Sequence, residues 1–231
     1  MIKFNGKDVI PRFNGKDVSR VMYNGKQIYP SNKGIDPATA SNGVYIYSND
    51  GLLYNPDNWD TANNDNAVGV AVIDDNCKFA ITKGEKPQRA WSNSLYGVDV
   101  DGLTNYSEAF QAITDFNGKN NTAVIRAAAP SEDASNNTAH YCYNQTVSIN
   151  GNTVHGYLLA LGELQVVYNN KSLVDSTMSL IGGTAIPNSA ASWSSTESSA
   201  SLAWRFGLAT GNPNRAYKDN TYYVVPVFPL T

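Results

Sequence analysis

The chain has 231 residues, of which 42% are hydrophobic and 16% are charged, and its formal net charge is −3. This composition is typical of a globular protein and excludes a disordered or fibrous one. Because 17 basic residues nearly balance 20 acidic ones, and no apolar run reaches the roughly 18 residues of a membrane span, we expect no nucleic-acid partner and no membrane insertion. The two cysteines, Cys77 and Cys142, either pair or remain buried free thiols.

A short repeat opens the chain. FNGKDV stands at residues 4–9 and again at 13–18, and YNGKQI follows at 23–28. Each copy places an aromatic residue before Asn-Gly, a dipeptide that favours the type I′ turn of a β-hairpin. We therefore predict an all-β appendage over residues 1–30, a meander too small to fold alone. It is either a docking or oligomerisation element, with a homotrimer as the expected state, or a simple strand extension of the main domain.

The main domain is predicted over residues 31–231. Residues 30–43 are rich in Pro, Ser, Asn and Gly and carry no hydrophobic period, which indicates a linker. Short strands are predicted at residues 44–47, 68–73 and 78–82, the last two joined as a hairpin around residues 74–76, with an Asn- and Asp-rich loop at residues 55–66.

Few helices are predicted. Ser107 is expected to cap a helix over residues 108–116, with Gly118 as its stop. Its apolar stripe comprises Ala109, Phe110, Ile113 and Phe116. Further helices fit residues 161–168 and 173–181, the second ended by Gly182 and Gly183. Two or three short helices among many short strands predict an α+β fold with a largely antiparallel sheet.

The converging titratable groups of an enzyme are not found in the sequence. His140 and His155 stand in separate strand-like segments without metal-binding spacing. Asp99-Val-Asp-Gly102 resembles the start of a calcium loop but lacks its later acidic positions, so a turn is expected there and a structural calcium stays an open alternative. The serines of residues 193–201 have no associated base and are expected to form turn hydrogen bonds. We therefore expect a non-enzymatic protein with no catalytic residue, no cofactor and no bound metal.

The last 40 residues carry the most informative pattern. In a strand, Trp204, Phe206 and Leu208 share one face, which places Arg205, Gly207 and Ala209 on the other. The first face is expected in the core, and the second continues into residues of unrelated size and charge that folding does not require. The candidate ligand-binding residues are Ala200, Leu202, Arg205, Gly207, Ala209, Asn212, Asn214, Arg215, Ala216, Tyr217, Asp219, Thr221 and Tyr222. Arg205, Tyr217 and Tyr222 are expected on one exposed surface.

Ordered motifs in this half of the chain resemble the variable proteins of diversity-generating retroelements, a family with a C-type lectin fold that includes phage tropism determinants. The matching motifs are Gly156-Tyr-Leu-Leu, Leu161-Gly-Glu-Leu164, Asn169-Asn-Lys171, Leu180-Ile-Gly-Gly183, Trp193-Ser-Ser-Thr-Glu197, Ala203-Trp204 and Tyr223-Val-Val-Pro-Val227. Together they cover most of residues 156–227, with a looser match back to Ala67. Val225 departs from the family pattern, which has Arg at this position.

The resemblance implies a C-terminal cassette, about residues 193–227, that adenine-specific mutagenesis of AAY codons rewrites over a fixed scaffold. Randomised AAY codons cannot encode Lys, Glu, Gln, Met or Trp. Residues of the forbidden types, Trp193, Glu197, Trp204 and Lys218, fall where the family pattern is fixed. The calcium-dependent sugar-binding motifs of C-type lectins are absent, so the resemblance does not imply lectin activity.

The expected function is therefore binding of a ligand or receptor, an unknown protein or glycan on a cell surface, through a hypervariable face. Polar and charged residues stand where a secretory signal has its apolar region, which favours a phage tail component, assembled in the cytoplasm into the virion. The alternatives are a variable binding protein on a bacterial cell surface and a structural virion protein without a ligand. The sequence identifies neither the ligand nor the choice between phage and host.

Overall fold

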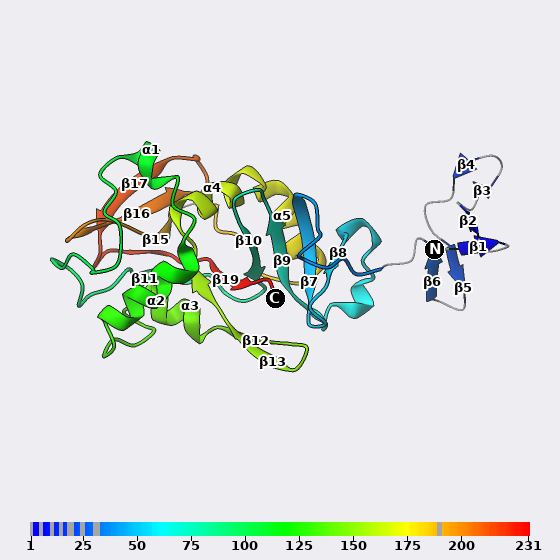
Figure 1. Ribbon diagram of the computed structural model, residues 1–231, viewed down its shortest axis with the longest axis horizontal. Coiled ribbons are helices and arrows are strands. Elements are labelled where there is room, and N and C mark those ends of the chain that lie inside the picture. The colour runs from blue at the N-terminus through cyan, green and yellow to red at the C-terminus, as the bar shows by residue number, and fades with distance from the viewer. Residues whose placement is uncertain are drawn as a thin grey trace.

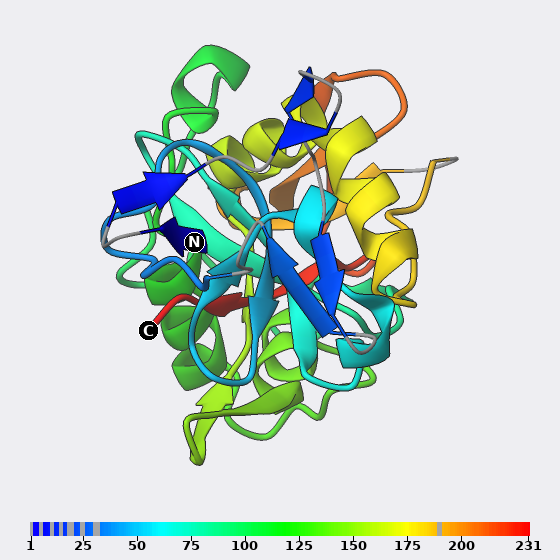
Figure 2. The same ribbon diagram turned by 90° about the vertical axis from the view of Figure 1, so that its right-hand side faces the viewer.

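The computed structural model (Figure 1) describes residues 33–188 and 191–231 in full, and the backbone of six short strands between residues 2 and 29. These strands form three antiparallel hairpins: β1 (Ile2–Phe4) with β2 (Lys7–Val9), β3 (Arg12–Phe13) with β4 (Lys16–Asp17), and β5 (Val21–Tyr23) with β6 (Lys26–Tyr29). Strand pairing within each repeat is confirmed, but the hairpins are three two-stranded sheets and not one meander. The Asn-Gly turns lie outside the described residues. Figure 2 views the molecule from the end at which the hairpins lie.

A six-stranded antiparallel sheet forms one half of the body. Its strands, in spatial order, are β14 (Tyr157–Leu158), β19 (Pro226–Pro229), β10 (Lys78–Thr82), β9 (Ala67–Ile73), β7 (Gly43–Ser48) and β8 (Leu53–Tyr54). The predicted strand at residues 44–47 and the hairpin of residues 68–73 with 78–82 are confirmed. The loop at residues 55–66 contains two short 3-10 helices, η1 (Pro56–Asn58) and η2 (Thr61–Asn63).

Both faces of this sheet are buried, as the uninterrupted apolar sequence of β9 requires. Val70 and Val72 pack into the main core with residues of the helical layer, whereas Ala71 and Ile73 pack on the opposite side. That side is covered in part by the hairpin of β12 (Thr146–Ile149) and β13 (Asn152–His155). Gly69 sits where a Cβ atom would lie 2.2 Å from the carbonyl oxygen of Ile81, so only glycine allows the two strands to pair here.

A second, five-stranded sheet forms the other half. Its strands, in spatial order, are β11 (Gln88–Ala90), β18 (Thr221–Tyr223), β15 (Ala191–Ser199), β16 (Leu202–Gly207) and β17 (Pro213–Tyr217). The pairing of β15 with β18 is parallel, and the other pairings are antiparallel. The domain is therefore α+β with mostly antiparallel sheets, as predicted.

Five α-helices are present in the described residues, more than the two or three predicted: α1 (Ala109–Ala112), α2 (Gly118–Ala128), α3 (Thr138–Asn144), α4 (Leu161–Asn169) and α5 (Lys171–Leu180). The predictions at residues 161–168 and 173–181 are confirmed. Gly182 ends α5 with φ +70°, and the amides of Gly182 and Gly183 donate to the carbonyls of Ser179 and Met178, which is a Schellman motif. None of the described helices has the length and apolarity needed to cross a membrane.

The predicted helix at residues 108–116 is wrong in extent. Only one turn forms, with Glu108 instead of Ser107 at the N-cap position and no capping bond from its side chain, and Phe110 is 69% exposed. Gly118 begins α2 instead of ending a helix. Glycine is required at this position for another reason: a Cβ atom there would lie 2.2 Å from Oε2 of Glu163. Helices α2 and α3 were not predicted from the sequence.

Candidate functional site

The C-terminal segment, residues 193–227, is called the cassette below and contains all or most of four of the five strands of the second sheet (Figure 1). The predicted alternation in β16 is confirmed: Trp204, Phe206 and Leu208 are 4%, 1% and 1% exposed and belong to the main core. Arg205 is half-buried on the opposite face. The two faces of β16 therefore differ in character, and the core side is fixed by large apolar side chains.

The candidate ligand-binding residues divide into three groups by exposure. Ala209, Asn212, Asn214, Arg215, Tyr217, Asp219 and Thr221 are exposed, whereas Ala200, Leu202, Arg205, Gly207 and Tyr222 are half-buried. Ala216 is 8% exposed and packs with Trp91 and Trp193, so its assignment to the exposed face is wrong. The cause is that Ala216 pairs with Ala203, and both residues lie in the core cluster that contains Trp91 and Trp193.

The candidate ligand-binding residues do not all lie on one face of the second sheet. Arg205 lies with its guanidinium carbon 4.6 Å from the centre of the Tyr222 ring, so these two are together as predicted. Tyr217 pairs with Leu202, so it lies on the side of the sheet that carries Trp204. The centre of its ring is 6.0 Å from the centre of the Tyr96 ring. The predicted common surface of Arg205, Tyr217 and Tyr222 is therefore wrong, because side chains alternate between the faces of a strand.

The exposed residues of β17 lie at an edge. β17 is the last strand of its sheet, and among the residues that the structure describes no further strand pairs with its free side. Asn214, Arg215 and Tyr217 are exposed on this edge strand, and the backbone amide of Arg215 donates to Oδ1 of Asn214 at 2.8 Å. Arg215 is held by two contacts: it lies 5.6 Å from the Trp204 ring and donates to the carbonyl oxygen of Ser107 at 3.2 Å.

A buried frame supports this edge. The indole of Trp193 donates to the carbonyl oxygen of Arg89 at 3.0 Å, and that of Trp91 donates to the carbonyl oxygen of Ser194 at 2.8 Å. Trp204 donates to the carbonyl oxygen of Tyr106 at 2.8 Å. These three bonds join the cassette to β11 and to the loop that follows it, and they satisfy polar groups that burial would otherwise leave unpaired.

An ion pair lies in the same frame. Lys218 and Glu197 are paired, and both side chains are fully buried. The Lys218 ammonium also donates to the carbonyl oxygen of Val98 at 2.7 Å and lies 4.9 Å from the Trp91 ring. Burial raises the pKa of Glu197 and lowers the pKa of Lys218, and the ion pair opposes both shifts. The pair therefore fixes β17 and β15 against the loop at residues 95–98.

The serines of β15 have a structural role. Ser192 and Ser194 are fully buried and donate to the carbonyl oxygens of Tyr223 and Trp204 at 3.1 and 2.7 Å. They join neighbouring strands, so the prediction of turn hydrogen bonds for the serines of residues 193–201 is wrong for Ser194. Sequence reasoning missed Trp91 as a partner of the cassette, because no local pattern around it signals a contact more than 100 residues away.

Other chemistry-bearing residues are dispersed. Cys77 and Cys142 are free and buried. A ring nitrogen of His140 bonds to the carbonyl oxygen of Ala129 at 3.0 Å, and His155 stacks on Tyr143. Within the described ranges, no three His, Cys, Asp or Glu side chains converge on a position that could hold a metal ion.

Comparison with known proteins gives a likeness of fold. No protein-family model matches the chain, and no curated protein matches its sequence. Among solved structures, the fold is similar to that of a fimbrial protein from Bacteroides ovatus ATCC 8483, with a TM-score of 0.58 and 15% sequence identity. The similarity covers 82% of this chain and 49% of that chain, so this chain spans about half the length of the fimbrial protein.

Proposed function

We propose that the protein is a non-enzymatic ligand-binding protein, a C-type-lectin-like domain whose C-terminal cassette is a retroelement-diversified binding surface. One observation carries the proposal. Exposed side chains of unrelated chemistry, Asn212, Asn214, Arg215, Tyr217, Asp219 and Thr221, follow one another on and beside an edge strand. The residues beneath them form a closed network of tryptophans and a buried ion pair.

The division between edge and frame suits a variable binder. A fixed frame lets the exposed residues change without unfolding the domain, because substitutions at exposed positions usually cost less than about 0.5 kcal/mol. Tyrosine and arginine supply most of the affinity in many protein interfaces, and Tyr217 and Arg215 are the exposed members of these types. We propose them as the anchors of the contact.

The proposed location is a phage tail, where several copies raise avidity by about 10²–10⁴ when their geometry permits simultaneous binding. The alternative is a variable binding protein on a bacterial surface, a setting suggested by the fimbrial protein whose fold is similar. The other alternative to a ligand-binding function is that the protein is a structural component of the virion and has no ligand.

Binding to cells tests the proposal. Fluorescently labelled protein is applied to a panel of bacterial strains, together with a triple variant, Asn214→Ala, Arg215→Ala and Tyr217→Ala. We expect the wild-type protein to label at least one strain and the triple variant to lose at least about 90% of that signal, a change of about 1.4 kcal/mol or more, at an unchanged melting temperature.

The matched control changes three exposed residues elsewhere, Lys33→Ala, Asn152→Ala and Leu173→Ala, and is expected to label as the wild type does. Equal labelling by the edge variant and this control would contradict the proposed face.

We further propose that residues 1–30 assemble the protein as a homotrimer, since a segment of about 30 residues cannot bury enough apolar area alone. Light scattering on the full chain and on a chain starting at Ser31 tests this. We expect a trimer and a monomer, respectively. A monomeric full chain at micromolar concentration would refute the assembly role.

A further inference from the structure

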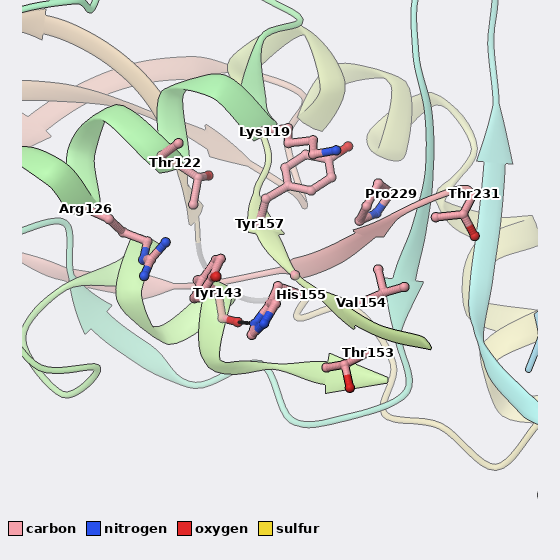
Figure 3. A pocket seen from close by; sticks show the side chains of 12 residues that line it. Lys119, Thr122, Arg126, Tyr143, Thr153, Val154, His155, Tyr157, Pro229 and Thr231 are labelled. Atoms are coloured by element: carbon pink, nitrogen blue, oxygen red, sulfur yellow. Dashed lines mark hydrogen bonds between the residues drawn. The ribbon is translucent and has the colours of Figure 1, made fainter. Parts of the chain in front are cut away.

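A cavity of about 320 Å³ lies among α2, α3, the segment from β13 to β14 and the end of β19, and β17 is not part of its lining. Figure 3 shows it between α2, which contributes Lys119, Thr122 and Arg126, and the segment that runs from β13 into β14. Tyr143 of α3 and Pro229 of β19 complete its walls. The volume falls within the range of small-molecule binding sites.

The lining of this cavity is cationic. Lys119 and Arg126 are seven residues apart on α2, which places them on one face of the helix about two turns from each other. His155 adds an imidazole ring to these two basic side chains. The lining contains no Asp or Glu side chain. Thr231, the last residue of the sequence, is part of the lining, and the carboxyl group of Glu163 lies 3.5 Å from the hydroxyl of Tyr157. Burial raises the pKa of Glu163 to about 8, which favours its neutral form.

Arg126 is fixed in place but has no anionic partner. Its guanidinium carbon lies 3.3 Å from the centre of the Tyr143 ring, and Tyr143 stacks on His155 with ring centres 4.1 Å apart and an interplanar angle of 6°. Figure 3 shows the three side chains as one stack along the wall of the cavity. Within the described residues, Arg126 forms no ion pair or side-chain hydrogen bond, and its Nε is buried without a partner. A planar cation held this way is preorganised for a carboxylate or phosphate.

The same wall provides a hydrogen-bond acceptor. Nδ1 of His155 lies 2.9 Å from the carbonyl oxygen of Tyr143. In the neutral ring Nδ1 therefore carries the proton, and Nε2 is left as an acceptor for a hydroxyl group. Exposed Thr153 adds a hydroxyl, and Ala123, Val154 and Pro229 supply apolar surface. The lining therefore combines a cation, a hydroxyl acceptor and an apolar wall.

We propose that this cavity binds a small acidic sugar, with the anionic group on the terminal nitrogens of Arg126 and the hydroxyls directed toward His155 and Thr153. Lys119, at the other end of the helical stripe, adds electrostatic attraction. The site is distinct from the variable edge strand and does not depend on the function proposed for that edge. An anionic group on the sugar is either a carboxylate or a phosphate, and both match the guanidinium fork.

Calorimetric titration of the full chain with glucuronate, glucose 6-phosphate and glucose tests the assignment. We expect at least one of the two acids to bind, glucose to bind at least about ten-fold more weakly, and Arg126→Gln to weaken the acid by about 10- to 100-fold, the usual loss for a hydrogen bond to a charged group. Whichever acid binds identifies the anionic group. Lys33→Gln removes the same charge from an exposed position outside the cavity and is expected to bind as the wild type does.

Three results would each overturn the proposal. Glucose could bind as tightly as the acids, or folded Arg126→Gln could bind the acid as the wild type does. The third is that neither acid binds at concentrations up to about 10 mM, which corresponds to a binding free energy weaker than about −3 kcal/mol. Arg126→Lys keeps the positive charge without the planar fork, and we expect it to bind less tightly than the wild type but more tightly than Arg126→Gln. If Arg126→Gln does not fold, weaker binding of the acid by Arg126→Lys than by the wild type tests the same prediction.

Discussion

Replacing Lys218 with methionine is expected to reduce the free energy of unfolding by about 3–5 kcal/mol, because the substitution leaves the Glu197 carboxylate buried without a positive charge beside it. Both side chains are fully buried, and methionine fills a similar volume, so a cavity does not account for the loss. Urea unfolding followed by tryptophan fluorescence measures the change.

The matched control is the double variant Glu197→Gln with Lys218→Met. It removes both charges, and we expect it to regain at least half of the lost stability, because a neutral amide is less costly to bury than an unpaired carboxylate. If the single variant loses less than about 1 kcal/mol, the ion pair is not a structural element of the frame.

Replacing Trp204 with alanine is expected to cost about 3–5 kcal/mol, the usual loss for a large aromatic residue in a core. Trp204 is 4% exposed and its indole donates to the carbonyl oxygen of Tyr106. The matched comparison is Tyr217→Ala on the neighbouring strand, where the side chain is 53% exposed. We expect that variant to lose less than about 1 kcal/mol. Equal losses in the two variants, measured by thermal unfolding, would contradict the division between frame and exposed edge.

The sequence predicts the strand alternation of β16 because a period of two reports directly which side chains face the core. It does not predict which face of the sheet a residue of the next strand occupies. The pairing of Tyr217 with Leu202 and of Ala216 with Ala203 depends on the turn between β16 and β17. A shift of one residue there exchanges the two faces, so the predicted side of Tyr217 is wrong. Ala216 lies on the same side as Arg205 but is buried there against Trp91 and Trp193.

Helix α2 was missed for a different reason. Its buried positions include Asn121 and Thr122, which do not form an apolar stripe. Asn121 donates to Asp115 at 2.9 Å, and Thr122 donates to the carbonyl oxygen of Gly118 at 2.7 Å. Tertiary and backbone hydrogen bonds therefore permit the burial of polar residues, and hydrophobic periodicity alone does not report such a helix. The anion cavity, which α2 lines, was missed with it.

The cationic stack of the cavity had no local signal either. Arg126, Tyr143 and His155 come from three separate elements, and only their packing brings them together. By contrast, Trp193, Glu197, Trp204 and Lys218 were each singled out in the sequence, and all four are buried in the structure. Sequence reasoning found fixed residues of the frame but not the partners that hold them.

The central claim is that exposed residues of the cassette vary for binding over a fixed frame. Comparing the coding sequence with a neighbouring template repeat in the same genome tests it most directly. We expect such a repeat, with differences only where the template has adenine. They should fall on the codons of Asn212, Asn214, Arg215, Tyr217, Asp219 and Thr221, whereas the codons of Trp193, Glu197, Trp204 and Lys218 should be identical. Absence of a repeat, or differences spread equally over the buried codons and over all four bases, would contradict the account.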